Sequence, residues 1–322
     1  MQPEQWAYRV PFRIARGVAQ ALEVVVVTLT DATGCVGRGE AAGVDYDGET
    51  VAGMTVAIEA LAGRIEAGLT RAELARLLPT GGARNALDCA LWDLEAKQTG
   101  VPAVRRAGFA AQPPITSCFT LGLDTDAATA ELAERYREWP LLKLKLDANR
   151  HLDVVRLVRR YCPEAALIVD ANQAWSCEQL NELAPELEAL GVRLIEQPVR
   201  RGEDASLRGY RGRIRLGADE SCVDRGSLAE LAGLYQVVNI KLDKTGGLTE
   251  ALALAAAARA AGFALMVGNM AGTSLAMAPG MIVAQGAEFV DLDGPLLHSA
   301  DRADAIEYRR GVMSPPAAAL WG

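Results

Sequence analysis

Charged side chains end several apolar runs in the middle of the chain. Asp170 ends Leu-Ile-Val-Asp, Glu196 ends Leu-Ile-Glu, and Asp219 follows Ile-Arg-Leu-Gly-Ala. Runs of β-favouring residues between helical segments indicate buried parallel strands, and the carboxyl ends of such strands share one face. Three carboxylates that meet there repel one another and need a cation to stay ionised. One acid alone could cap a helix, but three in succession predict an oxygen-lined Mg²⁺ site.

Lysines flank these acids along the chain. Leu-Leu-Lys-Leu-Lys-Leu places Lys143 and Lys145 before the first acid, and Val-Val-Asn-Ile-Lys places Lys241 after the last. Strand alternation sends Lys143 and Lys145 to the same face. A single lysine would usually lie at the surface, but unpaired lysines are too costly to bury as core filler. We interpret the flanking lysines as two bases facing across a substrate, with pKa values that desolvation, repulsion and the metal lower towards about 7–8.

The spacing of the runs predicts strands that bring these residues together. Expected strand ends at residues 121, 146, 170, 196, 218, 241, 267 and 291 recur at intervals of about one βα unit. Segments 127–139, 176–190 and 248–261 between them are rich in Ala and Leu and have helical periodicity. Eight such ends predict an α/β fold, a (β/α) barrel over residues 113–302 with its site at the carboxyl ends of the strands.

Residues 1–110 differ from this pattern and predict an α+β capping domain. Segments 23–29 and 36–40 indicate a hairpin, and helices are expected at 50–67, 71–78 and 82–99. Gln112, Pro113 and Pro114 mark the expected joint to the barrel. Segments 13–17 and 43–48 are either plain surface loops or lids over the barrel mouth.

The composition favours an enzyme that acts on small molecules. Half of the 322 residues are hydrophobic, enough for a barrel and a smaller domain. The net charge of −8, without a dominant basic cluster, argues against nucleic acid or an anionic membrane as partner. Six cysteines without Cys-x-x-Cys spacing are expected to be buried, reduced thiols. Without a leader pattern or a run of about 20 apolar residues, we expect a cytoplasmic protein, and also a homo-oligomer.

The ordered motifs together resemble the enolase superfamily, muconate-lactonising subgroup. They are Lys143-Leu-Lys145, Asp170-Ala-Asn172, Glu196-Gln197-Pro198, Ala218-Asp219-Glu220-Ser221 and Asn239-Ile-Lys241-Leu-Asp-Lys-Thr-Gly-Gly247. The resemblance covers essentially the whole chain. It implies a modified TIM barrel, (β/α)7β, with an N-terminal capping domain to which residues 303–322 return. It also implies that Asp170, Glu196 and Asp219 bind one Mg²⁺, which holds the substrate carboxylate.

The same resemblance implies that Lys145 and Lys241 are the acid/base pair. One removes the proton α to the carboxylate while the metal stabilises the enediolate, and the other returns a proton to the opposite face. Lys143 is then an electrostatic partner, and Asn172 and Glu220 support the metal ligands from outside. The two histidines, His151 and His298, lie beyond the second and eighth strands and are expected at the surface, so a His-Asp base is not expected.

The end of the eighth strand narrows the reaction. Asp291 and Asp293 are two residues apart, can face the same side and are not needed by the metal, so they suit a cationic group. The alternative is a role in helix capping and turns. In the dipeptide epimerases that the chain resembles, a similar Asp-x-Asp binds the substrate α-ammonium. Arg13 or Arg16 of the cap is expected to pair with the distal carboxylate of an Ala-Glu-like substrate, and Asn269 to line the pocket.

The leading prediction is a Mg²⁺-dependent dipeptide epimerase, an isomerase that inverts the α-carbon of the C-terminal residue. An N-acylamino acid racemase, for instance of N-acetylglutamate, shares the chemistry, but its substrate has no ammonium group. Lyase or cycloisomerase members such as o-succinylbenzoate synthase use one of the same lysines for the proton and the other as a cation. A barrel that only binds ligands is disfavoured, because every ligand and base position is filled.

Overall fold

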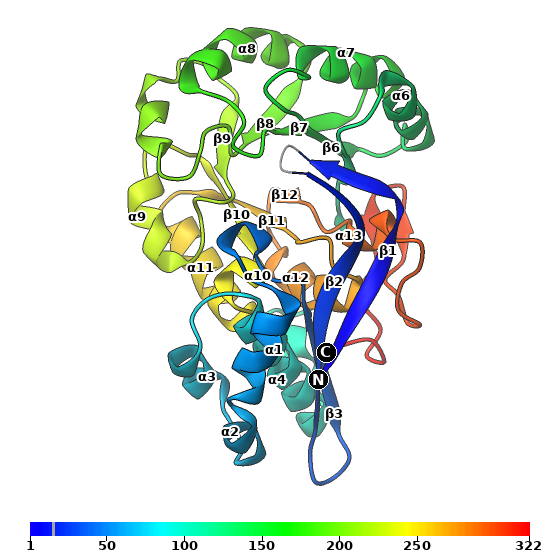
Figure 1. The fold of residues 1–322 in the computed structure, drawn as a ribbon, viewed down its shortest axis with the longest axis vertical. Coiled ribbons are helices and arrows are strands. Elements are labelled where there is room, and N and C mark those ends of the chain that lie inside the picture. The colour runs from blue at the N-terminus through cyan, green and yellow to red at the C-terminus, as the bar shows by residue number, and fades with distance from the viewer. Residues whose placement is uncertain (15–16) are drawn as a thin grey trace.

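The chain folds into two main sheets of different kinds, as the computed structural model in Figure 1 shows for residues 1–14 and 17–322. An antiparallel N-terminal sheet has the strand order β1-β2-β3, and an eight-stranded parallel sheet runs in chain order from β5 to β12. These two parts confirm the predicted fold class, a barrel with an α+β cap. The exact limits of the two domains stay a prediction.

The cap sheet consists of β1 (Gln2–Ile14), β2 (Gly17–Thr30) and β3 (Val36–Ala41). The four consecutive valines of β2, residues 24–27, are all buried because both faces of the strand are covered there. Val25 and Val27 pack towards the cap helices, whereas Val24 and Val26 belong to the cluster that includes the barrel. Strand β1 was not predicted, because its polar residues resemble a loop. Its antiparallel pairing with β2 makes it a strand.

The cap helices are α1 (Val51–Glu59), α2 (Ala62–Glu66), α3 (Arg71–Leu77), α4 (Gly82–Thr99) and α5 (Ala103–Arg106). The single helix expected at 50–67 is therefore wrong, since the chain breaks between α1 and α2. The β-branched residues and the glycines Gly53 and Gly63 in this segment lower its helix propensity. The helices expected at 71–78 and 82–99 are confirmed within one residue.

The barrel strands end where the sequence predicted, within one residue. They are β5 (Phe119–Leu121), β6 (Leu141–Lys145), β7 (Ala166–Asp170), β8 (Val192–Glu196), β9 (Arg215–Ala218), β10 (Val237–Lys241), β11 (Ala264–Gly268) and β12 (Phe289–Val290). The backbone N–H of Cys118, just before β5, donates to the oxygen of Val290 at 2.8 Å. This bond brings the first and last strands together, so the curled sheet approaches a closed barrel.

Helices cover the outside of the barrel and side chains fill its lower interior. The helices are α6 (Asp126–Arg135), α7 (Leu152–Tyr161), α8 (Cys177–Ala189), α9 (Leu228–Leu231), α10 (Leu242–Thr245), α11 (Leu248–Ala260), α12 (Ser274–Val283) and α13 (Gly294–Leu297). Inside, one buried cluster takes residues from seven strands or their starts: Cys118, Leu141, Ile168, Leu194, Val237, Met266 and Phe289. This apolar layer closes the bottom of the barrel and leaves the carboxyl ends of the strands for a site.

Polar contacts join the cap to the barrel through α4. Arg84 donates to the backbone oxygens of Thr245 and Gly246 at 2.5 and 3.1 Å. A Cβ on Gly246 would lie 2.3 Å from the Arg84 side chain, so only glycine permits this approach, at a positive φ of 75°. The segment after Lys241 therefore does more than turn the chain into α11, as the sequence suggested: it seats the cap.

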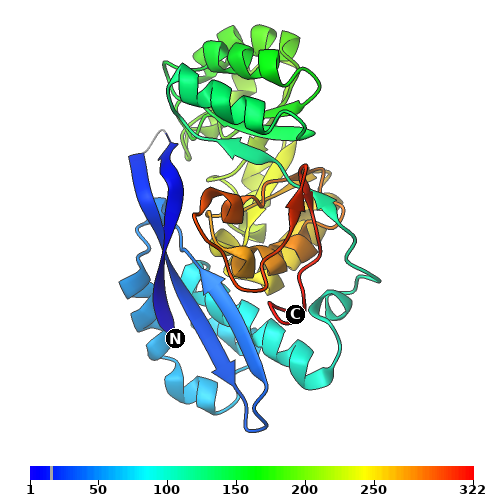
Figure 2. The ribbon, with the colours of Figure 1, turned by 90° about the vertical axis from the view of Figure 1, so that its right-hand side faces the viewer.

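The last residues of the chain also return to the cap, as Figure 2 shows. The indole N–H of Trp321 donates to the backbone oxygen of Cys89 on α4 at 3.1 Å, and Ala103 N donates to Gly322 O at 3.0 Å. Before this return, the tail forms a small antiparallel sheet. In it, β13 (Tyr308–Arg309) pairs with β14 (Val312–Met313), and β14 pairs with β4 (Ile115–Thr116). The tail thereby crosses from the barrel to the cap.

Two smaller expectations concern the thiols and the membrane. All six cysteines are free, but Cys35 and Cys177 are only half-buried, which corrects the expectation that each is in the core. Over the part of the chain that the structure describes, no helix is both long and apolar enough to cross a bilayer.

Candidate active site

The three predicted acids lie side by side at the carboxyl ends of β7, β8 and β9. Asp170, Glu196 and Asp219 are buried, and the parallel register pairs Asp170 with Glu196. The ammonium of Lys143 lies 3.1 Å from Asp170 Oδ2 and 2.7 Å from Glu196 Oε2, so these two carboxylates face one point. Asp219 contacts Lys241 at 2.6 Å. The structure thus brings the predicted acids and lysines into one cluster.

Burial and neighbouring charges divide these acids into two kinds. Burial acts to raise the pKa of each carboxyl group, but the ammonium groups around Asp170 and Asp219 outweigh it and hold their pKa below the usual range. At Glu196, burial and the negative charge of Asp170 prevail and raise the pKa to about 7. Additional positive charge at this point would relieve the repulsion between Glu196 and Asp170.

Lys145 and Lys241 stand at opposite ends of the row of acids. Lys145, on β6, contacts Asp170 at 2.6 Å, and Lys241, on β10, contacts Asp219 at the same distance. Both side chains line one cavity together with Lys143. The two amines therefore enter the cavity from either side of the acids.

The pKa values of Lys143 and Lys241 do not show the expected lowering in this structure. Burial lowers the pKa of Lys143 and Lys241, but Asp291 beside Lys143 and Asp219 beside Lys241 outweigh burial, so both pKa values are raised. Repulsion between the lysines, on which the prediction was based, would lower these pKa values. Each of the two ammonium groups, however, contacts a carboxylate directly.

The donor set at the strand ends fits a hard divalent cation. All three side chains offer carboxylate oxygens, and Glu196 Oε2 accepts no well-aligned hydrogen bond and contacts only the Lys143 ammonium. The three acids do not, however, place one oxygen each within 4.8 Å; among the described residues, Cys118, Asp291 and Asp293 do. Because the Lys143 ammonium occupies the point that Asp170 and Glu196 share, and Lys241 contacts Asp219, a bound cation would require these groups to move aside.

Asp291 and Asp293 form a second acidic pair beside the first cluster. Asp291 Oδ2 accepts from Lys143 at 2.8 Å, and Asp293 Oδ2 accepts from the backbone N–H of Thr120 at 2.6 Å. Burial and the charge of Asp291 raise the pKa of Asp293 to about 7, whereas Lys143 outweighs burial at Asp291 and lowers its pKa. Asp293 occupies the N-cap position of α13 without a capping bond from its side chain, so the capping alternative has no support there.

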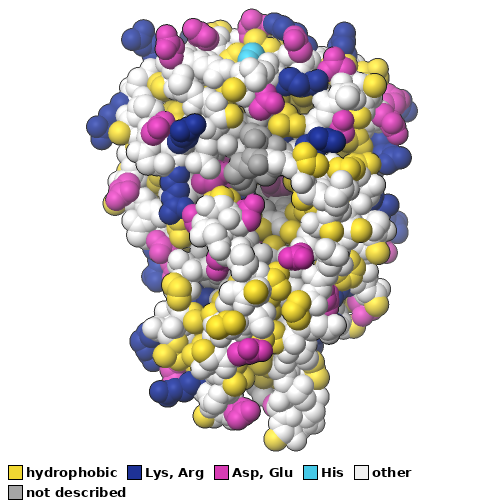
Figure 3. All heavy atoms as spheres, viewed as in Figure 1, with side chains coloured by type: hydrophobic (Ala, Val, Ile, Leu, Met, Phe, Trp, Pro, Cys, Tyr) yellow, Lys and Arg dark blue, Asp and Glu magenta, His cyan; other side chains and the backbone are white. Residues whose placement is uncertain are grey.

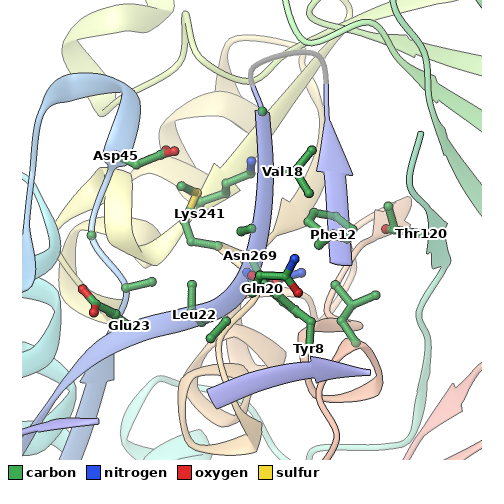
Figure 4. Close-up of a pocket in the computed structure, with 18 of the residues that line it drawn as sticks. Tyr8, Phe12, Val18, Gln20, Leu22, Glu23, Asp45, Thr120, Lys241 and Asn269 are labelled. Carbon is green, nitrogen blue, oxygen red and sulfur yellow. Dashed lines mark hydrogen bonds between the residues drawn. The ribbon is translucent and has the colours of Figure 1, made fainter. Parts of the chain in front are cut away.

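The cavity above these groups has a volume of about 740 Å³ and lies between the barrel mouth and the cap (Figure 3). Figure 4 shows Tyr8, Phe12, Val18 and Gln20 of the β1–β2 hairpin on one side of it. Other parts of its wall come from the loop after β3, with Gly43, Asp45 and Glu49, and from the barrel. Of the two segments expected to be surface loops or lids, 43–48 lines the cavity with Gly43 and Asp45 and 13–17 with Gly17, while residues 15–16 lie outside the described part of the chain.

Of the remaining residues predicted for the site, some line the cavity and others do not. Asn269 lines the cavity and donates to the backbone oxygen of Asp291 at 2.6 Å. Arg13 is exposed and is not among the described lining residues; only its backbone oxygen meets the barrel, accepting from Leu123 N at 2.9 Å. Arg16 lies outside the described residues. Asn172 lines the cavity, and its amide reaches Glu220 at 3.4 Å.

The prediction of a surface position is wrong for His298. Its ring is fully buried, stacks on Tyr8 with ring centres 5.0 Å apart, and places Nε2 2.6 Å from Ala271 O. The reason is β1, the strand that the sequence did not predict, which covers this position. His151 is half-buried and accepts from Leu152 N at the start of α7.

Two residues of the fifth motif were missed as parts of the site. Lys244 is buried and donates to Asp219 Oδ1 at 2.7 Å and Asn239 O at 3.0 Å, as well as to Asp219 O. Asn239 donates to Glu196 Oε1 at 2.6 Å. A signal was present, because Lys244 follows Lys241 by about one helical turn inside an otherwise buried segment.

Comparison with known proteins agrees with this arrangement. The N-terminal domain of mandelate racemase / muconate lactonizing enzyme matches residues 1–107, and the enolase C-terminal domain-like model matches residues 127–319. The L-Ala-D/L-Glu epimerase of Escherichia coli (strain K12) is 41% identical over 314 residues, 96% of this chain and 97% of that protein. An N-acetyl-D-glutamate racemase of Pseudoalteromonas is 47% identical over 252 residues, 78% of this chain and 79% of that protein.

Solved structures show the same likeness. An enolase family member from Agrobacterium tumefaciens with homology to dipeptide epimerases, solved with sodium and L-Ala-L-Glu, has a TM-score of 0.97 at 41% identity and covers 100% of this chain and 98% of its own. A dipeptide epimerase from Enterococcus faecalis V583, solved with Mg and L-Leu-L-Tyr, has a TM-score of 0.91 at 25% identity and covers 99% and 97%.

The fold and site define a capped barrel protein whose strand ends carry acids between two lysines. The matched domains then place it plainly: this chain belongs to the enolase superfamily, with the N- and C-terminal domains of its mandelate racemase / muconate-lactonising branch.

Proposed function

We propose that this chain is a Mg²⁺-dependent epimerase of dipeptides that inverts the α-carbon of the C-terminal residue. The observation that carries the proposal is the placement of Lys145 and Lys241, which enter one cavity from either side of three buried carboxylates. An α-carbon held between two amines can lose its proton to one and gain a proton from the other on the opposite face. The product is the inverted epimer, with no net change in atoms.

Asp170, Glu196 and Asp219 would hold the metal ion, which when bound would neutralise the carboxylate next to the reacting carbon. Neighbouring groups support these ligands. Asn172 N donates to Asp170 Oδ1 at 2.8 Å, and Lys143 adds a positive charge that does not reach the reacting carbon in this assignment. The relatives solved with a cation and a dipeptide support the same assignment.

Asp291 and Asp293 would bind the α-ammonium of the N-terminal residue. Both line the cavity. Lys143 donates to Asp291 Oδ2, while uncharged groups of Cys118 and Thr120 donate to Asp291 Oδ1 and the backbone N–H of Thr120 donates to Asp293 Oδ2. A carboxylate pair suits an ammonium group because charge-assisted hydrogen bonds are stronger than neutral ones. For the distal carboxylate of an Ala-Glu-like substrate, Arg13 or Arg16 remains the proposed partner from the cap.

Deuterium exchange tests the two-base assignment. With L-Ala-L-Glu in deuterated water and Mg²⁺, proton NMR should show loss of the Glu Cα proton and growth of the D-epimer. Lys145→Ala and Lys241→Ala should each reduce epimerisation by about 10²–10⁴-fold, and one of them should retain exchange of a single epimer. Epimerisation that persists in both variants would refute the roles of the two lysines.

An N-acylamino acid racemase is the second candidate, and the N-acetyl-D-glutamate racemase relative favours it. Its substrate lacks the ammonium that Asp291 and Asp293 would bind. Asp291→Asn should therefore cripple turnover of a dipeptide and spare turnover of N-acetylglutamate. Comparing both substrates with the wild type and Asp291→Asn separates the candidates, because wild-type turnover of N-acetylglutamate alone would exclude the dipeptide assignment.

A further inference from the structure

A loop of the cap, residues 43–50, is tied to the barrel at a buried carboxylate. Asp243 lies two residues after Lys241 and accepts a hydrogen bond from the backbone N–H of Gly43 at 2.9 Å. It is 6% exposed and also bonds the side chain of Asn85 on α4. Since Asn85 Oδ1 accepts from Cys89 at 3.2 Å, its amide nitrogen is the group that faces Asp243. Asp243 thus bonds two separate parts of the cap.

The geometry at Gly43 leaves the loop little freedom. Its φ is 79°, and a Cβ there would lie 3.0 Å from the sulfur of Met54. Glu49, at the other end of the loop, accepts from Val44 N at 2.8 Å and Gly82 N at 2.9 Å. The bond from Val44 closes the loop on itself, and the bond from Gly82 ties its far end to the start of α4, so the contact at Gly43 is what holds the near end to the barrel.

A second contact joins this loop to the barrel at the molecular surface. Arg201 pairs with Asp47 at 2.8 Å, but both side chains are more than 40% exposed. Exposed ion pairs contribute little because solvent screens them, whereas a buried hydrogen bond to a carboxylate contributes more. The buried contact at Asp243 should therefore restrain the loop more than the exposed pair does, and the exposed pair offers a matched control.

We infer that Asp243 is a positioning residue for substrate recognition, which fixes the loop at residues 43–50 relative to Lys241. The loop contributes Gly43, Asp45 and Glu49 to the cavity wall, and Figure 4 shows Asp45 beside the cavity that Lys241 enters. Because Asp243 and Lys241 are on one short segment, this segment positions both the loop at residues 43–50 and one reacting amine. The nature of the substrate rests on the proposed function; the positioning of the loop does not.

Hydrogen exchange combined with kinetics tests this role. Asp243→Leu removes the acceptor, Asp243→Asn keeps one carbonyl oxygen for Gly43, and Arg201→Met breaks only the exposed pair. In Asp243→Leu, amide exchange in residues 42–50 should accelerate by about tenfold or more, and KM for L-Ala-L-Glu should rise by a similar factor with kcat within about twofold. Asp243→Asn and Arg201→Met should stay close to the wild type in both measurements.

Two outcomes would overturn the inference. Unchanged exchange in residues 42–50 of Asp243→Leu would show that the bond does not hold the loop, and a fall in kcat with an unchanged KM would show that Asp243 acts through Lys241 instead. If Asp243→Leu does not fold, the same measurements are made on Asp243→Ser. The serine hydroxyl is too close to the backbone to reach Gly43. Exchange requires no turnover, so a wild type that epimerises no dipeptide would defeat the proposed function and leave this test intact.

Discussion

The two walls of the cavity are held in different ways. The barrel wall consists of buried charged side chains joined by ion pairs, such as the 2.6 Å contacts of Lys145 and Lys241 with Asp170 and Asp219. The cap wall consists of half-buried or exposed side chains on β1, β2 and one loop, such as Tyr8, Val18 and Gln20. The groups of the barrel wall are therefore fixed by charge, whereas the cap side chains that cover the cavity are not.

This difference has a physical consequence for substitutions. A buried charge is costly unless it is paired, so each lysine and each acid of the barrel wall depends on its neighbours. A change at one of them alters the electrostatics of all. Exposed side chains on the cap have few partners, and substitutions there act locally. The barrel wall should tolerate little change, and the cap wall should accept changes that alter substrate preference.

The largest effect is expected at Glu196 on the barrel wall. Glu196→Gln keeps the shape and can still bond Asn239, but it removes a metal-binding charge. The wild-type Tm should rise with Mg²⁺, equivalent to about 2.7 kcal/mol at one hundred times Kd, and the variant should lose this rise together with at least about 10³-fold in activity.

Differential scanning calorimetry with and without Mg²⁺ measures the first effect. Glu188→Gln, on the exposed face of α8, is the control and should behave as the wild type. A Mg²⁺-dependent rise in Tm that survives in Glu196→Gln would remove Glu196 from the metal site and weaken the contrast between the walls.

The next largest effect is expected from Gly268→Ala. Gly268 ends β11 and lies opposite Lys241 of β10. A Cβ at this position would lie 2.7 Å from Asn239 Oδ1 and 3.1 Å from Lys241 Cε. Gly268→Ala must therefore displace the Asn239 amide and push Lys241, a proposed base, by a few tenths of an ångström. Since a misplacement of about 1 Å costs on the order of 10²-fold in rate, we expect a loss of up to about this size. Steady-state kcat measures the loss.

Gly217→Ala in β9, on the other side of β10, is the matched control. Its Cβ would meet Leu194 at 3.4 Å or more, an ordinary contact, so its kcat should fall much less. Equal losses in the two variants would indicate general damage to the barrel instead of displacement of Lys241.

A third prediction concerns Asp243, where the two walls meet. Burial, aided by the charges of Glu49 and Glu40, raises its pKa from 3.8 to about 7 in the folded state. The folded protein then holds a proton that the unfolded chain releases, so the stability from this group is complete below about pH 4 and is lost as pH rises through 7. Asp243→Asn cannot lose a proton, and its Tm advantage over the wild type should grow from pH 4 to pH 8.

Thermal unfolding across this pH range tests the sign. Asp153→Asn, at an exposed position of α7, should show no such trend. An advantage that is constant with pH would mean that the Asp243 carboxyl group titrates at the same pH in the folded and unfolded states.

The smallest effect is expected on the cap wall at Val18, which is 52% exposed. Val18→Ala should leave Tm within about 1 °C of the wild type, because surface substitutions usually change stability by less than about 0.5 kcal/mol. Its KM should shift by a few-fold and differently for L-Ala-L-Glu and for a dipeptide with an apolar C-terminal residue. Equal shifts for both substrates would argue against a role of this wall in selection.

Much of the barrel was predictable because its signals are local. Each of Asp170, Glu196 and Lys241 ends an apolar run of strand length, and the regular spacing of such runs predicts where they converge. The capping helix at 82–99 has its own stop signal in Gly100 and Pro102. By contrast, β1 and the break between α1 and α2 were missed, since the first depends on pairing with β2 and the second on weak local propensities.

The amino-acid sequence by itself determined which charges meet at the mouth of the barrel, since strand order and alternation place them without reference to distant contacts. Only the tertiary structure decided which charge bonds which. The bonds of Lys143 to Asp291 and of Gly43 to Asp243 join residues 148 and 200 positions apart, and β1 buries His298 from the other end of the chain. Such pairings follow from packing between elements far apart in the sequence, within the barrel or between barrel and cap, and no local pattern of residues contains that information.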